Sequence, residues 1–438
     1  MAFAAETNCL VRDPSTIIKR GDTYWVYGTG RGTQMFSSKD RLNWTKRGEA
    51  LPDTPQWLAV TVPGNRNEVW APDIHLFNGI YYLYSSYSQW GTTKSGIGLA
   101  TSKTLEPGSW QDKGLVITSA HGANYNTIDP CIFEDARGQP WLSFGSFFSG
   151  IKLIQIDPAT GMQSKANPKI YNIATRQTPG NAIEASCVYY KSGWYYLFVN
   201  WDSCCVGNKS SYNIRVRRSK AVTGPYLDKS DKDMMQGGGS LFLAAVYDNG
   251  KGRLIDDEVG PGHAAILKDK DGYWLSTHYE WAQDKRGATT ANVQRLEWDR
   301  DGWPRAILDP GPFSIVSMLP THAALTVSLA DTAARLAVQP RRSDAQEQKW
   351  TLTHTGEGFY TLTQNGKTAL GANSKDELLL LPMGKSANRL WYLRQNEDGA
   401  YSLLPKSDMN SALTITDAGS LSIQKHAGTE GESWTFHR

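Results

Sequence analysis

The stretch that decides the fold runs from residue 13 to residue 28 and reads DPSTIIKRGDTYWVYG. A short apolar strand, a turn with Gly and a strand rich in Tyr, Trp and β-branched residues are typical of a β-hairpin. The pattern returns four times, as APDIHLFNGIYYLYS at 71–85, DPCIFEDARGQPWLSFG at 129–145, EASCVYYKSGWYYLFV at 184–199 and GHAAILKDKDGYWLSTH at 262–278. The copies are far enough apart for one four-stranded sheet each, so the repeat predicts a five-bladed β-propeller.

The first residue of each copy is a candidate for the centre of this propeller. Each precedes an aromatic pair, or Pro-Trp in the third copy, by a nearly constant distance, so we take as equivalent Asp13, Ala71, Asp129, Glu184 and Gly262. Equivalent positions on innermost strands converge on the central channel, which predicts that three carboxylates face one another there. Like charges raise one another's pKa, and acid/base hydrolysis of a glycosidic bond needs one protonated and one ionised carboxyl. The alternative is that Asp-Pro only opens a turn, but a turn gives no reason for Glu184.

Composition and charge exclude several classes of partner. The 46 basic and 43 acidic residues give a formal net charge of +3 and are spread along the chain, so we expect no nucleic-acid partner and no membrane partner. No run approaches the ~20 consecutive apolar residues of a membrane span. Ala-Phe-Ala within Met1 to Ala5 matches the pattern at a signal-peptide cleavage site, so we expect a secreted or periplasmic protein.

The five cysteines fit neither a dense disulfide framework nor a zinc site with two close pairs. Adjacent Cys204 and Cys205 form either a vicinal disulfide or two packed thiols. The 16 Trp and 20 Tyr residues offer aromatic faces of the kind that stack on sugar rings, although most such side chains pack between sheets. Gly237, Gly238 and Gly239 precede a strand-like run and are interpreted as a turn.

An ordered set of motifs resembles the family 43 glycoside hydrolases, and within them the endo-α-1,5-L-arabinanases. The set is VRDPS, VWAPDIHLF, TIDPCIF, AIEASCVYY, NWDSCCVG, GPYLDK, GGGS and GPGH, and it spans roughly residues 8–312. The resemblance implies inverting hydrolysis of a plant cell-wall polysaccharide, either arabinan or arabinose-containing hemicellulose or pectin side chains. It also implies that Asp13 is the general base, Glu184 the general acid and Asp129 the modulator of the acid's pKa.

The same resemblance implies a metal ion and leaves the mode of action open. His278, in STHYEW, is expected near the channel axis, where one calcium or similar ion is held mostly through water. No organic cofactor is expected, because paired carboxylates need none. Trp281 in this motif departs from the arabinanase pattern, so an exo-acting α-L-arabinofuranosidase or β-xylosidase is the alternative within enzymes. A non-catalytic propeller lectin is the alternative outside them.

Two residues beside the carboxylates are candidates for substrate contact. Trp70, in VWAPDI, is predicted to stack on a sugar, with packing between blades as the alternative. Arg12 stands where arabinanases commonly carry His, and its guanidinium fork is predicted to face the substrate. Asp73 lies out of register with the three carboxylates and is predicted to be structural.

The C-terminal third carries a different repeat. After Gly311-Pro312 the aromatic hairpins stop, and Trp350, Trp391 and Trp434 follow one another at intervals of 41 and 43 residues. This spacing resembles the ricin-type β-trefoil, whose repeats end in Gln-x-Trp; Arg389 and Glu432 replace the Gln in two of them. The whole chain is therefore predicted to be all-β, with a propeller over 1–312 and a β-trefoil-like domain over 313–438. Such trefoils often bind sugars, so a carbohydrate-binding role is expected, with a structural appendage as the alternative.

Overall fold

The computed structural model describes residues 7–283, 288–330, 333–373, 375, 377–384, 386–416 and 418–438. Met1 to Ala5, which carry the cleavage-site pattern, lie outside the described residues. The described chain is almost entirely β, with a single four-residue α-helix, α1 (Leu58–Thr61), and five short 3₁₀ turns. None of its helices is long and apolar enough to cross a membrane.

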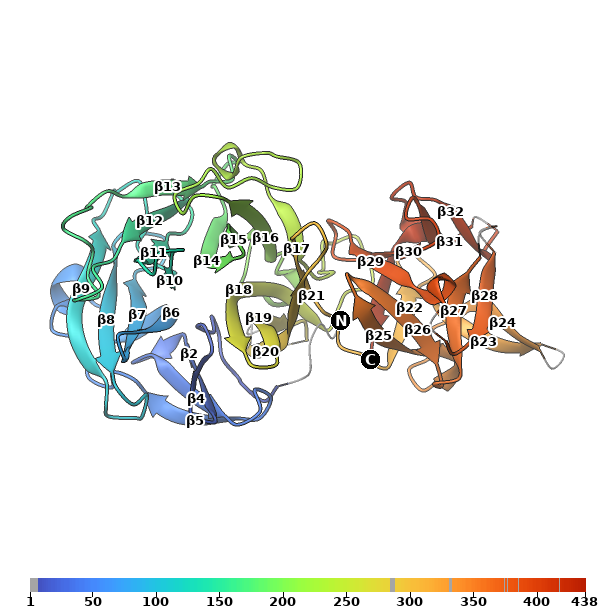
Figure 1. Ribbon diagram of the computed structural model, residues 1–438, viewed down its shortest axis with the longest axis horizontal. Coiled ribbons are helices and arrows are strands. Elements are labelled where there is room, and N and C mark those ends of the chain that lie inside the picture. Colours follow the sequence, from blue (N-terminus) through green and yellow to red (C-terminus); the bar gives the residue numbers. More distant parts are fainter. Residues whose placement is uncertain are drawn as a thin grey trace.

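Five sheets stand around a common centre (Figure 1) and confirm the predicted five-bladed propeller. The first blade consists of β1 (Ile18–Arg20), β2 (Thr23–Gly28), β4 (Gln34–Ser38) and β5 (Trp44–Glu49), and the second of β3 (Gly30–Arg31), β6 (Glu68–Phe77), β7 (Ile80–Ser88), β8 (Ser95–Ser102) and β9 (Gln111–Ser119). The third consists of β10 (Cys131–Glu134), β11 (Pro140–Phe144), β12 (Ile151–Gln155) and β13 (Tyr171–Ala174), and the fourth of β14 (Ile183–Lys191), β15 (Trp194–Trp201), β16 (Asn213–Ser219) and β17 (Ser240–Leu243). The fifth consists of β18 (Glu258–Asp269), β19 (Gly272–Trp281), β20 (Thr289–Trp298) and β21 (Pro304–Ala306). Every pairing within them is antiparallel, as the hairpin repeat requires.

Apolar side chains between neighbouring blades hold the ring together. Between the second and third blades, for example, Tyr82 and Leu99 belong to one buried cluster with Ile132 and Leu142. The ring closes where the first described residues meet the fifth blade: Ala291 in β20 donates its N–H to the Cys9 carbonyl at 2.9 Å. Burial of apolar surface at every blade junction therefore replaces a single central core.

A residue with positive φ lies in or before the innermost strand of each blade. These residues are Asp13 (φ 51°), Ala71 (21°), Asp129 (56°), Ala185 (51°) and His263 (54°). The sequence alignment placed Glu184 and Gly262 at this position, which is one residue too early. The fourth copy has three consecutive aromatic residues, and Lys191 pairs with Trp194 as Phe77 pairs with Ile80. Counting from Trp194 instead of Tyr195 produced the error in that copy.

The Gly237 to Gly239 run is a turn, as predicted. Gly237 ends the 3₁₀ turn Met234–Gln236 with φ 71°, a conformation that glycine adopts without strain. A Cβ on Gly238 or Gly239 would lie 2.7 Å from a guanidinium nitrogen of Arg217. Arg217 is fully buried, so these two glycines make room for its side chain.

The twelve strands after the propeller form a closed ring and three hairpins. The ring consists of β22 (Phe313–Ser317), β25 (Lys349–Gly356), β26 (Phe359–Gln364), β29 (Trp391–Gln395), β30 (Tyr401–Pro405) and β33 (Trp434–His437), each paired with the next and the last with the first. The hairpins consist of β23 (Ala323–Ala330) with β24 (Ala333–Pro340), β27 (Thr368–Ala372) with β28 (Leu378–Pro382), and β31 (Ser411–Ile415) with β32 (Leu421–Lys425). The architecture is threefold, in agreement with the tryptophan spacing.

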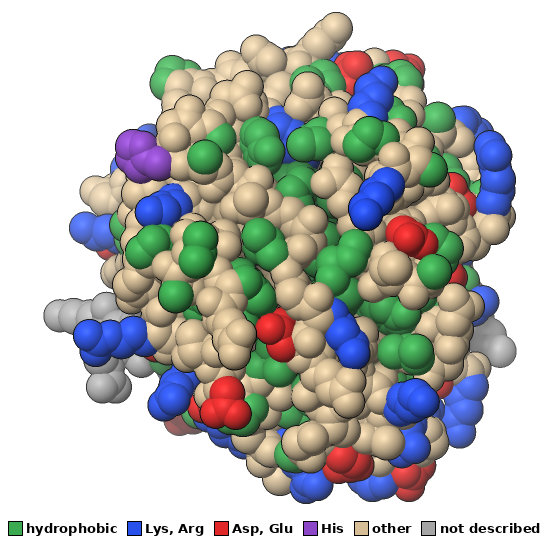
Figure 2. Space-filling view, turned by 90° about the vertical axis from the view of Figure 1, so that its left-hand side faces the viewer, with side chains coloured by type: hydrophobic (Ala, Val, Ile, Leu, Met, Phe, Trp, Pro, Cys, Tyr) green, Lys and Arg blue, Asp and Glu red, His purple; other side chains and the backbone are tan. Residues whose placement is uncertain are grey.

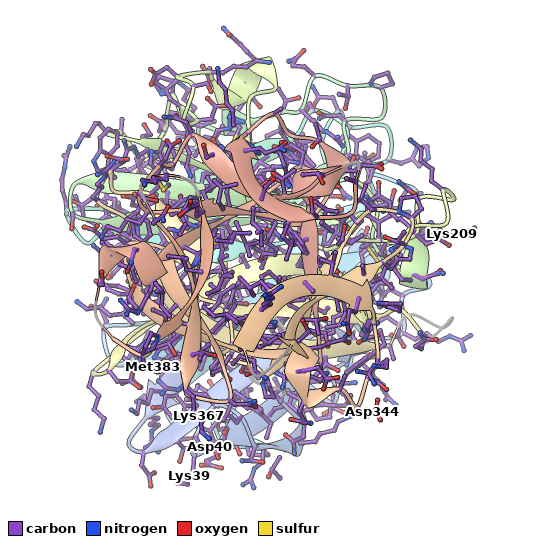
Figure 3. All side chains as sticks on the ribbon, turned by 90° about the vertical axis from the view of Figure 1, so that its right-hand side faces the viewer. Lys39, Asp40, Lys209, Asp344, Lys367 and Met383 are labelled. Atoms are coloured by element: carbon purple, nitrogen blue, oxygen red, sulfur yellow. A yellow bond between two sulfur atoms is a disulfide. The ribbon has the colours of Figure 1, made fainter. Side chains whose placement is uncertain are left out.

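Those three tryptophans occupy equivalent places in this C-terminal half. Trp350, Trp391 and Trp434 are fully buried, and their Nε1 atoms donate to the carbonyls of Leu325 at 2.9 Å, Leu370 at 2.9 Å and Leu413 at 3.0 Å. Figure 3 looks onto this half, with side chains filling its interior and the labelled Asp344, Lys367 and Met383 near its lower rim. The tryptophans are therefore core residues that tie each hairpin to the ring.

The propeller and the C-terminal half share an extensive contact. One buried cluster includes Leu243 and Tyr279 of the propeller together with Tyr360 and Tyr401 of the C-terminal half. Gln395 accepts the Ala244 N–H at 3.0 Å and donates to the Ala244 carbonyl at 2.7 Å. Deleting the C-terminal half would therefore expose apolar surface of the propeller. On the propeller face seen in Figure 2, acidic and basic side chains are interspersed, as the sequence indicated.

Candidate active site

Asp13 precedes the first hairpin, and its carboxylate is held from several sides. Thr29 donates its hydroxyl to Oδ2 at 2.5 Å, and the Nδ1 atoms of His278 and His263 lie 3.4 and 3.7 Å from Oδ1. Burial alone raises the pKa of Asp13, but the two imidazoles, Arg12 and the Thr29 hydroxyl lower it, and the net shift is downward. Burial also lowers the pKa of His263, and that of His278 to about 3, so both rings are neutral at pH 7. At that pH the charge of Arg12 and the Thr29 hydrogen bond keep Asp13 ionised.

Glu184 lies at the start of β14 between two hydroxyl groups. Tyr212 donates to Oε1 at 2.9 Å, and Ser146 donates to Oε2 at 2.7 Å. Burial raises the pKa of Glu184, the two hydroxyls lower it, the charge of Asp13 raises it, and the net direction is upward. A hydroxyl can turn from donor to acceptor, so both partners also accommodate a protonated Glu184.

Asp129 is buried beside these two carboxylates. Its pKa is raised well above the usual range by burial and then by the charges of Glu184 and Asp13, so the structure brings the three predicted carboxylates together. Its Oδ2 accepts the N–H of Ala185 at 3.1 Å. An amide N–H cannot accept a proton, whereas the hydroxyls around Glu184 can. When Asp129 and Glu184 together retain one proton, that proton is therefore accommodated more easily on Glu184 than on Asp129.

The amide of each positive-φ residue reaches to the preceding blade. Four of these amides donate to a side chain in or just after the second strand of that blade: Asp13 to His278 Nδ1 at 3.0 Å, Ala71 to Thr29 Oγ1 at 2.8 Å, Asp129 to Ser86 Oγ at 2.9 Å, and His263 to Asn200 Oδ1 at 3.0 Å. The third blade has Gly145 at this place, and a Cβ there would lie 2.7 Å from the Gly150 carbonyl oxygen. With a side chain excluded at Gly145, the carboxylate of Asp129 itself receives the fifth amide.

The residue before each positive-φ position forms a second equivalent set. Arg12 and Trp70 occupy in the first and second blades the place that Glu184 occupies in the fourth. Trp70 is half-buried and meets Trp90 edge-on, with ring centres 6.0 Å apart, and Trp90 is 82% exposed. Trp70 is thus not enclosed between blades. Two aromatic rings therefore stand on the second blade, and one of them, Trp70, is at the position equivalent to Glu184.

Arg12, which precedes the first blade, contacts a loop of the fourth blade, so the contact spans the fifth blade that lies between them. Cys204 and Cys205 form a vicinal disulfide, and Arg12 Nη1 lies 2.8 Å from the Cys205 Sγ. Glu280 of the fifth blade holds the same loop by accepting the Cys205 N–H at 2.6 Å and the Gly207 N–H at 3.0 Å. This contact bounds one side of the site. The remaining thiols, Cys9, Cys131 and Cys187, are buried and unpaired.

His278 offers one nitrogen to a metal ion. Its Nε2 is buried without a hydrogen-bond partner among the described residues, and its imidazole is neutral, which is the form that binds a metal. Binding at Nε2 requires the neutral ring to carry its proton on Nδ1, 3.4 Å from Asp13 Oδ1, and therefore to give up the hydrogen bond that Nδ1 accepts from the Asp13 N–H at 3.0 Å. The described residues hold no cluster of three or more His, Cys, Asp or Glu that could surround an ion. The site therefore fits a metal only if water supplies most of its ligands.

Asp73 is structural, as predicted. Its Oδ1 accepts the Thr16 N–H and its Oδ2 accepts the Ile132 N–H, each at 2.9 Å, so it ties the second blade to the first and the third. Trp281 binds within its own blade by donating Nε1 to Thr290 Oγ1 at 2.8 Å.

Several residues that contact the carboxylates were not predicted from the sequence. Thr29 occupies the same place in the first copy as His278 in the fifth, so a register extended along the second strand would have identified it. His263 was aligned one residue away from its true position. Ser146 follows the third hairpin and Tyr212 precedes β16, so neither lies in a repeated motif that could have signalled its role.

Comparison with known proteins agrees with this geometry. The family described as "Glycosyl hydrolases family 43" matches residues 7–304. The extracellular endo-α-(1→5)-L-arabinanase 1 of Bacillus subtilis is 42% identical over 307 residues, which are 69% of this chain and 90% of that protein. The extracellular exo-α-(1→5)-L-arabinofuranosidase ArbA of Cellvibrio japonicus is 38% identical over 309 residues, 67% of this chain and 86% of that protein.

Solved structures give the same result. The GH43 endo-arabinanase of Bacillus licheniformis superimposes with a TM-score of 0.63 at 41% identity, covering 69% of this chain and 99% of that one. The endo-1,5-α-L-arabinanase of Thermotoga petrophila covers 99% of this chain and 100% of that one, with a TM-score of 0.61 at 20% identity, which is a likeness of fold.

Proposed function

The chain belongs to family 43 of the glycosyl hydrolases, and we propose that it hydrolyses the α-1,5-linked L-arabinofuranosyl bonds of arabinan with inversion. The observation that carries the proposal is the meeting of Asp13, Asp129 and Glu184 from three blades, with the pKa of Asp13 lowered and that of Glu184 raised. An inverting glycosidase needs one carboxylate as base and one protonated carboxyl as acid. The two opposite shifts provide that pair at neutral pH.

Asp13 acts as the general base. Its ionised carboxylate takes a proton from the water that attacks the anomeric carbon, while Thr29 and Arg12 keep it ionised and oriented. Glu184 acts as the general acid and donates its proton to the departing glycosidic oxygen. Tyr212 and Ser146 hold its two oxygens in place and can accept or donate as its protonation changes.

Asp129 tunes the acid. The charge of Glu184 raises the pKa of Asp129, and because this repulsion is mutual an ionised Asp129 disfavours ionisation of Glu184, so the acid keeps its proton until the leaving oxygen can take it. The hydrogen bond from Ala185 fixes the Asp129 carboxylate next to Glu184 in the chain. Asp129 is therefore a positioning and charge-tuning residue of the reaction.

The substrate is a plant cell-wall arabinan, met outside the cell. Two relatives, one named an extracellular endo-arabinanase and the other an extracellular exo-arabinofuranosidase, support this proposal. Trp70 is the candidate platform for a sugar ring, because it is half-buried at the position equivalent to Glu184. Arg12 is the candidate donor to substrate hydroxyl groups from the neighbouring first blade.

Endo action is the first candidate and exo action the second. The contact between Arg12 and the disulfide loop bounds one side of the site and favours capture of a chain end. Product analysis on linear arabinan separates the two modes: endo action yields a ladder of oligosaccharides, and exo action yields one small product from the start. Replacing Asp13 or Glu184 with Ala should abolish both patterns; turnover that persists in either variant would overturn the mechanism.

A hydrated divalent cation such as calcium belongs to this proposal. His278 Nε2 would be its one protein ligand, and a bound cation would supply positive charge near the base Asp13. Chelation should weaken hydrolysis of linear arabinan by the unmodified enzyme and leave a His278→Gln variant unaffected. An equal response of both proteins to the chelator would contradict the ligand role of His278.

The C-terminal half is proposed to be a β-trefoil over residues 313–438. Its closed six-stranded ring, its three hairpins and its three buried tryptophans support this proposal. A carbohydrate-binding role is the functional part, since a second site on the same polymer raises local substrate concentration. Carbohydrate binding is measured by the retention of the inactive Glu184→Gln variant on insoluble arabinan, with soluble arabino-oligosaccharide as the competitor. Binding that disappears when Trp70 is also replaced would locate all affinity in the propeller and remove the lectin role.

A further inference from the structure

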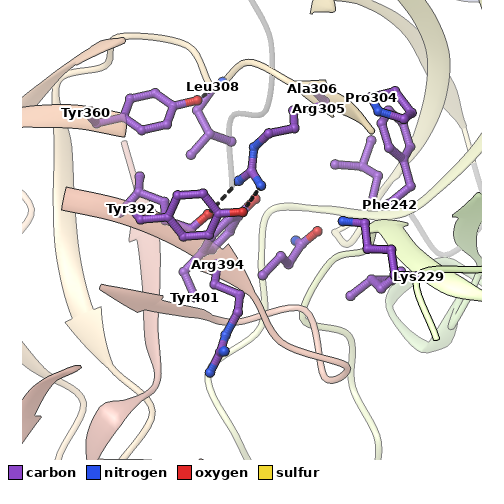
Figure 4. Close-up of a pocket in the computed structure, with 14 residues that line it drawn as sticks. Lys229, Phe242, Pro304, Arg305, Ala306, Leu308, Tyr360, Tyr392, Arg394 and Tyr401 are labelled. Carbon is purple, nitrogen blue, oxygen red and sulfur yellow. Dashed lines mark hydrogen bonds between the residues drawn. The ribbon is translucent and has the colours of Figure 1, made fainter. Parts of the chain in front are cut away.

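A small pocket lies between the propeller and the C-terminal half, away from the carboxylates (Figure 4). Its volume is about 150 Å³. Both halves contribute to it, through Lys229, Phe242 and Arg305 from the propeller and through Tyr392 and Arg394 from the ring. None of its lining residues contacts Asp13, Asp129 or Glu184, so it is separate from the hydrolytic site.

Two cations face this pocket without an anionic partner. In Figure 4 the amino group of Lys229 points toward Arg305 from across the space. Arg305 donates to the Tyr392 hydroxyl and to the Leu393 carbonyl at 3.1 Å, which are both neutral groups. Neither cation forms an ion pair with a described residue, and none of the lining residues is Asp or Glu. Two like charges are thus held together in a concave, partly apolar space.

Lys229 is exposed to solvent, and its pKa is lowered by the groups around it. Burial lowers the pKa of Lys229, the positive charge of Arg305 lowers it further, and Asp299 and Asp301 only partly oppose this shift. An anion in the pocket would stabilise both cations, because a charge-assisted hydrogen bond in a partly desolvated site is stronger than one in water.

The walls indicate that the anion carries a ring. Phe242 and Tyr392 line the pocket with aromatic surface, and Leu241 and Leu308 add aliphatic surface. A bare inorganic ion would use none of this surface, whereas a sugar ring has apolar faces that pack on aromatic side chains. The volume corresponds to roughly five water molecules, which admits one small ligand and excludes a longer chain segment.

We propose that this pocket binds a single carboxylated sugar residue, a uronic acid, with its carboxylate on Lys229 and its ring against Phe242 and Tyr392. The site needs both halves of the molecule and adds recognition of a single acidic sugar residue to the hydrolysis of a neutral polysaccharide. It does not depend on the assignment of the acid and the base.

Calorimetric titration of the full-length protein with D-galacturonic acid, D-galactose and inorganic phosphate tests the proposal. We expect galacturonic acid to bind at least roughly tenfold more tightly than galactose, since a hydrogen bond to a charged group is worth that much. Phosphate should bind more weakly than galacturonic acid, and added salt should weaken the galacturonic acid complex. No detectable galacturonic acid binding, or equal affinity for galactose, would overturn the proposal. Equal affinity for phosphate would show a simple anion site and overturn the sugar part.

Lys229→Gln is the matched test of location. Lys229 is exposed, and its Nζ lies 5.6 Å from the centre of the Trp303 ring, so its replacement should not disturb folding. Galacturonic acid affinity should fall at least about tenfold in this variant. Lys220→Gln is the control, because Lys220 packs over Trp194 at 3.6 Å and lines no part of the pocket. Unchanged affinity in Lys229→Gln, or an equal loss in Lys220→Gln, would refute the assignment.

Discussion

The carboxylate of Asp129 accepts the backbone N–H of Ala185 at 3.1 Å, which fixes a charged group of the third blade to the residue next to Glu184 in the fourth. At the other four blade junctions the corresponding amide binds a neutral side chain. The exception arises because Gly145 leaves no room for a side chain at the usual place. The propeller thus uses a structural hydrogen bond to position the charge that tunes its acid.

Replacing Asp129 with Asn keeps an acceptor for the Ala185 N–H and removes the charge. Without that charge the pKa of Glu184 falls, so the acid loses its proton at lower pH. We expect kcat on linear arabinan to fall by about 10²-fold or more and the alkaline limb of the kcat/KM profile to move to lower pH. A profile with an unmoved alkaline limb would assign Asp129 a purely structural role.

Replacing Tyr212 with Phe removes the hydroxyl that donates to Glu184 Oε1 at 2.9 Å. This donation favours the ionised form, so its loss raises the pKa of Glu184 and moves the alkaline limb to higher pH. The loss in kcat should stay within about tenfold, because one hydrogen bond is removed. Tyr87→Phe is the control, since the Tyr87 hydroxyl is buried without a hydrogen-bond partner among the described residues. An alkaline limb that moves equally in both variants would refute the role of Tyr212.

Replacing Arg12 with Gln removes the permanent positive charge beside Asp13. The pKa of Asp13 then rises, because Arg12 lowers it in the native protein. Activity that depends on ionised Asp13 is lost as pH falls through that pKa, so the acid limb of the kcat/KM profile should move to higher pH. The pH dependence of kcat/KM on linear arabinan measures this shift. An acid limb that stays in place would mean that Arg12 has no electrostatic part in keeping the base ionised.

Replacing Trp391 with Phe removes the hydrogen bond from Nε1 to the Leu370 carbonyl at 2.9 Å and leaves that buried carbonyl unsatisfied. We expect the free energy of unfolding, measured by urea denaturation, to fall by about 1–3 kcal/mol. Trp90→Phe should change it by less than about 0.5 kcal/mol, because that ring is on the surface. Equal effects of the two substitutions would contradict the structural role of the buried tryptophans.

Most of the fold could be predicted because the sequence contains two internal repeats, one in each half of the molecule. The repeated hairpins predict the blades, and the spacing of Trp350, Trp391 and Trp434 predicts the threefold C-terminal half. The structure also explains why the residue two positions before those tryptophans varies. Gln348 and Arg389 donate to the carbonyls of Pro340 and Pro382, which end their hairpins, and Glu432 accepts the N–H of Ala427 just after its hairpin. Different side chains perform one task there, so a strict motif could not find all three.

The site was predictable only where the repeat reaches it. Asp13 and Asp129 emerged from their shared position, and Glu184 emerged although its register was one residue off. Tyr212 and Ser146 approach Glu184 from outside the repeated hairpins, so only the packing of blades brings them there. The pocket at Lys229 and Arg305 depends on how the two halves meet, which no pattern within either half encodes.

The most direct test of the account compares two substrates of the Glu184→Gln variant. Cleavage of linear arabinan needs a proton on the leaving oxygen. The phenolate of an aryl arabinofuranoside leaves without one when the phenol is strongly acidic. We predict a loss of about 10³-fold or more in kcat on arabinan and a far smaller loss on the aryl substrate. Equal losses on both substrates, or arabinan activity close to that of the unmodified enzyme, would contradict Glu184 as the general acid.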